Sequence, residues 1–243
     1  MGSSLVWISG ASGSIGQALA KTVPWDGARV VGISRGRPEG AIEHIPADLA
    51  DPSTWPAVGA SFRRELDAFT GEHVAFLHAA GTLDPIGFAA EVDSEAYIRN
   101  VLLNSAAAQV LGQLFLAAAH SCSARRYLIM LTSGAANSVY PGWSSYGAGK
   151  AAIDRWVRNV GAEQDERGGV QVVAVAPGTV DTGMQEQLRR TSEADFPSRQ
   201  KFVDLHAQGK LTDPQHVAGQ IWALIDSGVD NGSVIDLRKL ASA

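Results

Sequence analysis

The sequence has very little cysteine and no concentration of basic residues. A single cysteine, Cys122, excludes an intrachain disulfide framework, and because no second thiol or group of histidines stands near it, we expect no metal site. The net charge is −5, and the basic residues do not gather into a stripe. Because nucleic acids require a concentrated positive face, no nucleic-acid partner is expected.

Long hydrophobic runs and linkers are also missing. No stretch approaches the roughly 20 uncharged apolar residues that a bilayer span needs, so we expect no membrane contact. Residues 1–4 lead directly into a strand-like run, so no secretion signal is expected and the protein is predicted to be cytoplasmic. No linker, repeat or low-complexity tract divides the chain, so residues 1–243 are expected to form one domain.

What is present is an alternation of short Val-, Ile- and Leu-rich runs with longer helical patterns. This alternation is typical of βαβ units, and it predicts an α/β fold with a doubly wound, seven-stranded parallel sheet covered by helices on both faces. The expected strands are Leu5–Ile8, Ala28–Ile33, Ile42–Ile45, Val74–Leu77, Arg126–Leu131, Val170–Val175 and Ser233–Leu237.

Several short signals mark where helices begin and end. Asp51-Pro52 and Asp213-Pro214 predict helix starts, because an Asp cap is followed by proline at the first helical position. Gly168-Gly169 predicts a helix end. The one long irregular stretch, residues 182–211, is expected to be a lid over the active site with short helices of its own.

A glycine-rich turn follows the first predicted strand and opens a helical pattern. Dinucleotide-binding folds of the Rossmann type use this order, because glycines let the backbone approach a pyrophosphate whose charge the helix N-terminus stabilises. A tight strand-to-helix connection without a ligand is the alternative. The predicted cofactor contacts in this turn are Gly10, Ser12, Gly13, Ser14, Ile15 and Gly16.

The end of the second strand indicates which dinucleotide is bound. Folds that take NAD usually place an acidic residue there, where it binds both ribose hydroxyls. This chain has Ser34 and Arg35 instead, with Arg37 nearby, and their positive charge would attract a 2′-phosphate. The sequence therefore predicts NADPH, unless the two arginines only solvate an exposed turn.

Two further segments are predicted to line the cofactor. Asp48, followed by Leu49, stands where a carboxylate would bind the adenine amino group, although it would equally serve as a turn or capping residue. His78, which ends the fourth strand, is expected to be structural. The small residues after it would let the backbone pack against the cofactor, and they are Ala79, Ala80 and Gly81.

The candidate reacting centre combines a tyrosine, a lysine and a serine. Tyr146 and Lys150 are four residues apart and share one helix face. An ammonium beside a phenol stabilises the phenolate, so we expect the phenol pKa to fall from about 10 toward the working range. Ser133, at the carboxyl end of the fifth strand, would donate a hydrogen bond to the substrate oxygen. Lys150 would also bind the nicotinamide ribose.

Together these motifs resemble the short-chain dehydrogenase/reductase family over essentially the whole chain. The resemblance implies that Asn104 completes a proton relay to Lys150, with Asn100 as a rival judged to lie off the expected helix face. It also implies nicotinamide contacts from the segment after the sixth strand, which are Pro177, Gly178, Val180 and Thr182. Two departures are Ser14, where relatives usually have glycine, and His78, where they commonly have an asparagine that bridges strands.

Within the family, residues 80–86, 133–136, 140–146 and 235–237 look similar to the sepiapterin reductase and benzil reductase group. This resemblance implies reduction of one carbonyl of a vicinal diketone or of a pterin side chain. Alternatives are a 3-oxoacyl or alcohol dehydrogenase and, from another class, a non-catalytic NADP-sensing protein. Besides Ser133 and Tyr146, the predicted substrate contacts are Trp143, Met184 and Leu83, with Tyr140 and Val139 as further apolar walls.

The stretch from Ile98 to Ala119 is apolar nearly all round, whereas a surface helix would show one apolar stripe. Together with the helix that carries Tyr146, it would bury a symmetric partner. We therefore expect a homodimer or tetramer, unless loops or the lid cover this face.

Overall fold

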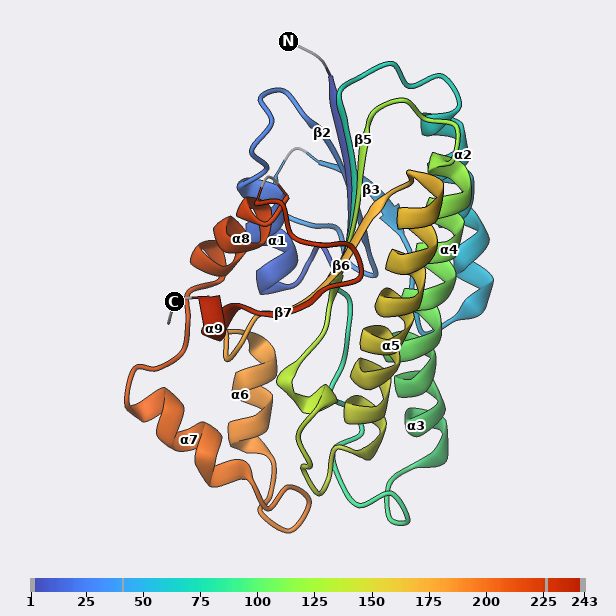
Figure 1. Ribbon diagram of the computed structural model, residues 1–243. Helices are drawn as coiled ribbons and strands as arrows, with labels where there is room; N and C mark the ends of the chain where they lie inside the picture. Colours follow the sequence, from blue (N-terminus) through green and yellow to red (C-terminus); the bar gives the residue numbers. More distant parts are fainter. Residues whose placement is uncertain (1–2, 41, 226, 241–243) are drawn as a thin grey trace.

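A computed structural model describes residues 3–40, 42–225 and 227–240. At its centre lies one sheet of seven parallel strands in the order β3-β2-β1-β4-β5-β6-β7 (Figure 1). The strands are β1 (Ser4–Ser9), β2 (Arg29–Ser34), β3 (Glu43–Pro46), β4 (His73–His78), β5 (Arg125–Leu131), β6 (Gln171–Ala176) and β7 (Val234–Asp236). Each predicted strand boundary is within one residue of the observed one, and the predicted doubly wound fold is confirmed.

Helices cover both faces of this sheet. They are α1 (Ser14–Lys21), α2 (Trp55–Leu66), α3 (Ser94–Val101), α4 (Ala107–Ala119), α5 (Ser144–Arg167), α6 (Gly183–Arg190), α7 (Arg199–Ala207), α8 (Pro214–Ala223) and α9 (Leu237–Leu240). In β1, Leu5 and Trp7 pack toward α2, α4 and α5, whereas Val6 and Ile8 pack toward α1 and α8. This two-sided burial explains why the strands read as continuous apolar runs.

The predicted helix caps are confirmed. The Asp51 carboxylate accepts from the Ser53 amide at 2.9 Å and starts a 3-10 turn before α2. The Asp213 carboxylate accepts from two amides at the start of α8, at 2.8 and 3.0 Å. Gly168 ends α5 with φ of 60°, a left-handed conformation that glycine adopts without strain.

The long apolar helix is not uniform. A π-helical turn, Leu102–Ala106, joins α3 to α4. By length and composition alone, Ser94–Ala119 is apolar enough to cross a membrane, so the expectation that no stretch approaches such a run was wrong. The run also contains the charged residues Glu95 and Arg99, and one such helix is weak evidence because core helices pass the same test. Leu111 and Phe115 are fully buried in the core against the sheet.

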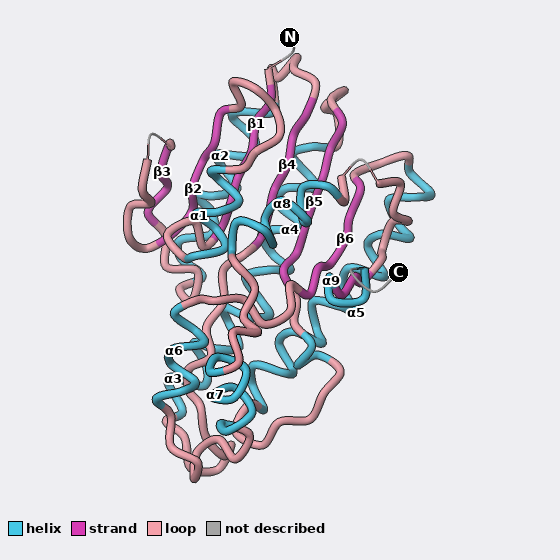
Figure 2. Tube along the Cα trace, turned by 90° about the vertical axis from the view of Figure 1, so that its left-hand side faces the viewer, coloured by secondary structure: helices cyan, strands magenta, loops and turns pink. Residues whose placement is uncertain are grey.

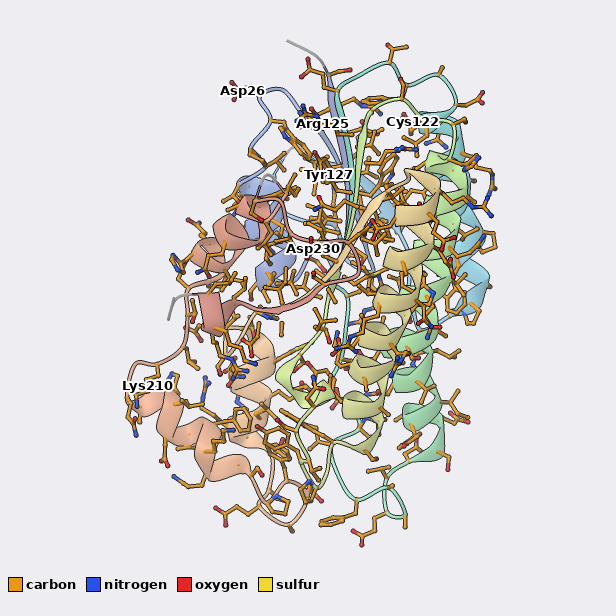
Figure 3. The ribbon with its side chains drawn as sticks, in the orientation of Figure 1. Asp26, Cys122, Arg125, Tyr127, Lys210 and Asp230 are labelled. Atoms are coloured by element: carbon orange, nitrogen blue, oxygen red, sulfur yellow. The ribbon has the colours of Figure 1, made fainter. Side chains whose placement is uncertain are left out.

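Beyond the carboxyl ends of the strands lie α6 and α7 (Figures 1 and 2). They confirm the short helices expected within residues 182–211. Cys122 and Tyr127 lie in the half of the molecule away from α6 and α7 (Figure 3). The buried Cys122 thiol is therefore no part of the region in which the predicted site residues gather.

Candidate active site

The glycine turn after β1 has the shape that a diphosphate requires. Gly10 has φ of +67°, and a Cβ there would lie 2.8 Å from the Ala80 backbone nitrogen. A Cβ on Gly16 would lie 2.2 Å from the Gly10 carbonyl oxygen. At Gly13, which directly precedes α1, no side chain caps the helix and the first turn of α1 holds no acidic residue. The turn therefore fits the anionic part of a dinucleotide, and Ser14 begins the helix without disturbing it.

The adenosine end carries a cluster of charges. Arg35 is exposed at the end of β2, while the buried Ser34 hydroxyl donates to the Gly36 carbonyl oxygen at 2.7 Å. The Asp48 carboxylate accepts from the Ala50 amide at 3.1 Å and from Arg99 at 2.6 Å. Although burial raises it, these hydrogen bonds hold the pKa of Asp48 below its usual value, with Arg35 adding to the effect.

The turn role that we weighed for Asp48 is therefore present, whereas its partner Arg99 was not predicted. Leu49 is buried in the core beneath α2, so its side chain serves packing. Ile15 also packs against the core, beside α1. Contact between these two residues and a cofactor would thus come from their backbones.

The His78 side chain bridges β4 and β1. Its Nδ1 lies 3.0 Å from the Ser9 hydroxyl, and that hydroxyl accepts from the Ala80 amide at 3.2 Å. Burial, with the nearby Lys150 cation, lowers the pKa of His78 to about 3, so its ring is neutral at physiological pH. The link between β1 and β4 supports the structural role predicted for His78 and holds Ala79–Gly81 beside the glycine turn.

Ser133 and Tyr146 meet at the carboxyl end of β5. Ser133 caps a short 3-10 turn, in which its hydroxyl accepts from the Ala135 amide at 3.2 Å, and a hydrogen bond also joins it to the Tyr146 hydroxyl. Tyr146 is buried, with 8% of the residue exposed. Two hydroxyl groups thus converge where a carbonyl oxygen would be bound.

Lys150 lies on the same side of α5 as Tyr146, with Nζ 5.8 Å from the phenol ring centroid. Its ammonium donates to the Leu131 carbonyl oxygen at 2.9 Å. Burial raises the pKa of Tyr146 above its usual value, opposed by the Ser133 hydrogen bond, so the predicted lowering by Lys150 was wrong. Burial is the larger of the two effects on the pKa of the phenol. The phenol therefore stays protonated and able to donate.

Asn104 lies in the π-helical turn and is fully buried. Its side chain accepts from the Thr82 amide at 3.0 Å and donates to the Thr82 carbonyl oxygen at 2.8 Å and to Asn100 at 2.9 Å. A Cβ on Gly81 would lie 3.1 Å from Asn104 Oδ1 and 3.6 Å from Lys150 Nζ. The structure therefore brings the asparagine and the lysine together.

The judgement that Asn100 lies off the Asn104 face was wrong. Residues four apart share a helix face, and the two side chains are hydrogen-bonded. Asn100 donates onward to the Asp84 carbonyl oxygen at 2.6 Å, so the pair ties the loop after β4 to α3. The close approach of α5 depends on Gly149, since a Cβ there would lie 2.8 Å from Asn104 Cβ.

The segment after β6 reaches the same edge. Val180 is buried and forms a β-bridge with Thr212, and Thr182 begins α6 without a side-chain cap. Against Gly178 lies Arg238, whose Cγ would be 3.0 Å from an added Cβ. The predicted nicotinamide contacts Pro177, Gly178, Val180 and Thr182 thus lie in the connection from the carboxyl end of β6 to α6.

The predicted substrate contacts come together in one cluster, which we call the aromatic wall. Its buried members are Leu83, Ala135, Trp143, Tyr146, Leu188, Phe196 and Phe202, with Ile86, Tyr140, Met184 and Leu205 packed against them. Val139 was wrongly included in the prediction, because it is 93% exposed. It sits in a loop before Tyr140 and turns to solvent.

The sequence reasoning missed the part of the aromatic wall that α7 and the segment before it supply. Phe196 is fully buried and stacks on Trp143, with ring centroids 4.6 Å apart. Lys201 on α7 donates to the Tyr140 hydroxyl at 2.7 Å. Gln187 on α6 donates to Asp84 at 2.5 Å. In the sequence, this part of the aromatic wall is indicated only by the apolar residues Phe196 and Phe202 within an otherwise irregular stretch.

Comparisons with known proteins agree with this arrangement. The family model described as short chain dehydrogenase matches residues 4–193. Benzil reductase ((S)-benzoin forming) from Bacillus subtilis (strain 168) is 31% identical over 236 residues, which cover 96% of this chain and 97% of that protein. Sepiapterin reductase from Xenopus laevis is 27% identical over 249 residues, covering 93% and 92%.

Among solved structures, a short-chain dehydrogenase/reductase from Saccharomyces cerevisiae superposes with a TM-score of 0.84 at 21% identity, covering 99% of this chain and 98% of that one. The chain therefore belongs to the short-chain dehydrogenase/reductase family. It is an oxidoreductase that acts on CH–OH or C=O groups with a nicotinamide cofactor.

Proposed function

We propose that this protein is an NADPH-dependent carbonyl reductase that reduces one carbonyl of a vicinal diketone or of a pterin side chain. The observation that carries the proposal is the contact between the catalytic hydroxyl pair and the aromatic wall, because Trp143 packs edge-on to Tyr146 with centroids 5.3 Å apart. A flat or aromatic substrate would lie on such a surface with its carbonyl at the hydroxyls. The names of the benzil and sepiapterin reductase relatives support this substrate class.

In this proposal the protein residues orient the carbonyl and move the proton. A bound nicotinamide cofactor supplies hydride to the carbonyl carbon. Ser133 holds the carbonyl oxygen with a hydrogen bond, and Tyr146 donates its proton to that oxygen as charge develops. Lys150 stabilises the resulting phenolate. Lys150 and Asn104 then return a proton from solvent to Tyr146. The product is an alcohol.

The preference for NADPH rests on the charge at the end of β2. Arg35 and Arg37 are both exposed there, and no acidic side chain takes the position that binds two ribose hydroxyls. Arg99 forms an ion pair with Asp48 and so compensates the negative charge of that carboxylate. Arg35 is therefore available to bind a 2′-phosphate.

We also propose that the chain forms one domain, acts in the cytoplasm and assembles at least into a dimer. Ile98 and Val101 on α3 are 58% and 42% exposed, which is unusual for large apolar residues on a long helix. A symmetric partner against α3, α4 and α5 would cover them. Light scattering tests this assembly.

A panel of carbonyl compounds and alcohols tests the function, with NADPH consumption as the readout for carbonyl reduction and NADPH formation as the readout for alcohol oxidation. Benzil and other vicinal diketones and pterins form the first group, and acetoacetyl thioesters and simple alcohols with NADP⁺ form the second. Turnover of the first group supports the proposal. Faster turnover of the second group would assign a 3-oxoacyl or alcohol dehydrogenase. Tight NADPH binding without any turnover would indicate a sensor.

A further inference from the structure

Asp154 is a buried acidic residue that the catalytic scheme does not use. It is 3% exposed and lies on α5 four residues after Lys150, which itself follows Tyr146 by four. Residues at this spacing share one helix face. The three side chains therefore form a single row that leads from the reacting phenol into the protein interior. Burial of a carboxylate is costly unless a charge or hydrogen bonds compensate it.

The carboxylate is held from neighbouring elements. Asn137 donates to Asp154 Oδ2 at 3.4 Å, and Thr132 also hydrogen-bonds to the carboxylate. The Thr132 hydroxyl also lies 3.3 Å from the Lys150 carbonyl oxygen. Because this hydroxyl has one proton, it donates to one of these two acceptors at a time. Because Thr132 directly precedes Ser133, Asp154 fastens the end of β5 to the helix turn that carries Lys150.

The charges around Lys150 come from few groups. On α5 these are Tyr146, Asp154 and, beyond Asp154, the exposed Arg158; on β4 it is His78, which is neutral. Within the part of the chain that the structure describes, no ion pair joins Lys150 to Asp154, so the carboxylate acts on the ammonium through its charge.

Burial and the charge of Asp154 have opposite effects on the pKa of Lys150. Burial lowers the pKa of Lys150 to about 8, and Asp154 opposes this fall. Burial raises the pKa of Asp154, whereas Thr132, Arg158, Asn137 and Lys150 favour its charged form. Because the pKa of Lys150 lies close to physiological pH, the charge of this lysine depends on its negative neighbour Asp154.

We propose that Asp154 is a positioning residue for the reaction, which keeps the buried Lys150 ammonium charged and held near Tyr146. This inference rests on the proposed carbonyl reductase function for its kinetic readout. It extends that function, because the Lys150–Asp154 pair would set the pH above which activity falls.

The sign of the expected effect follows from the chemistry. Lys150 is cationic below its pKa, so reduction should slow as pH rises through about 8. Asp154→Asn keeps the shape of the side chain but removes its charge, which lowers the pKa of Lys150. The basic limb of the kcat profile should then move to lower pH by roughly one unit.

Glu163→Gln is the matched control, because Glu163 is an exposed acid on the same helix. Its profile should equal that of the unmodified protein. A second readout needs no turnover: lysine labelled with 13C at Cε reports the titration of Lys150 by NMR. The chain has only five lysines, and Lys150→Met identifies the resonance. If no carbonyl compound is reduced, the proposed function fails while this titration still tests Asp154.

A parallel downward shift of the kinetic limb and of the Lys150 titration in Asp154→Asn supports the proposal. An unchanged Lys150 titration overturns it, and so does an equal loss of kcat at every pH, which would indicate a purely structural role. If Asp154→Asn does not fold, Asp154→Ser, which also removes the charge, decides the question, and the absence of a downward shift there overturns the proposal.

Discussion

The contact between Gly149 and the π-helical turn makes a quantitative prediction for Gly149→Ala. The added Cβ would lie 2.8 Å from Asn104 Cβ and 3.3 Å from the Asn104 carbonyl carbon and oxygen, whereas carbon atoms pack at about 3.5–4.0 Å. The helix and the turn must therefore separate by several tenths of an ångström. Overpacking of this kind costs about 1–3 kcal/mol, partly offset by about 1 kcal/mol gained in helix propensity.

The same displacement moves Asn104 and Lys150 relative to Tyr146. Misplacement by about 1 Å costs about 100-fold in rate, so kcat should fall by roughly 10- to 100-fold while Tm falls by only a few degrees. The assay pairs kcat for diketone reduction with thermal unfolding. Gly219→Ala on α8 is the control, because its Cβ meets nothing within 4 Å, and we expect it to raise Tm by about 2–4 °C with kcat unchanged. A Gly149→Ala enzyme with unchanged kcat would refute the reasoning.

Three further changes probe other parts of the protein. Arg35→Ala should raise the KM for NADPH far more than that for NADH in steady-state assays, and equal effects would remove the assignment of a 2′-phosphate site. Phe196→Ala should destabilise the protein by roughly 3 kcal/mol in denaturant titrations and raise the KM for an aromatic diketone, because Trp143 loses its stacking partner; an unchanged KM would separate the aromatic wall from substrate binding. Ile98→Glu should shift the protein toward monomers in light scattering with its folding preserved, and an unaltered mass would place the subunit contact elsewhere.

The sheet was predictable because its strands carry their own signal. Val6 and Ile8 face one layer of helices and Leu5 and Trp7 the other, so each strand appears as an uninterrupted apolar run. The glycine turn, Ser133 and the Tyr146–Lys150 pair were readable because they are defined by spacing along the chain. All of them meet at the carboxyl edge of the sheet.

The features that were missed depend on contacts between distant segments. The π-helical turn at Asn104 leaves no mark in the sequence, since Leu102–Ala106 continue the pattern of the helices on either side. Phe196 gains its importance only by stacking on Trp143, which lies 53 positions earlier. Asp154 could have been found, because it continues the four-residue spacing of Tyr146 and Lys150. The phenol pKa was misjudged because burial cannot be read from spacing.

The most direct test of the account is the rate of carbonyl reduction by Tyr146→Phe with benzil and NADPH in stopped-flow experiments. The substitution keeps the ring that packs against Trp143 and removes only the hydroxyl hydrogen-bonded to Ser133. The account predicts a loss of at least about 100-fold in rate with NADPH affinity retained. A variant that keeps most of its activity would contradict the role of this phenol as the proton donor.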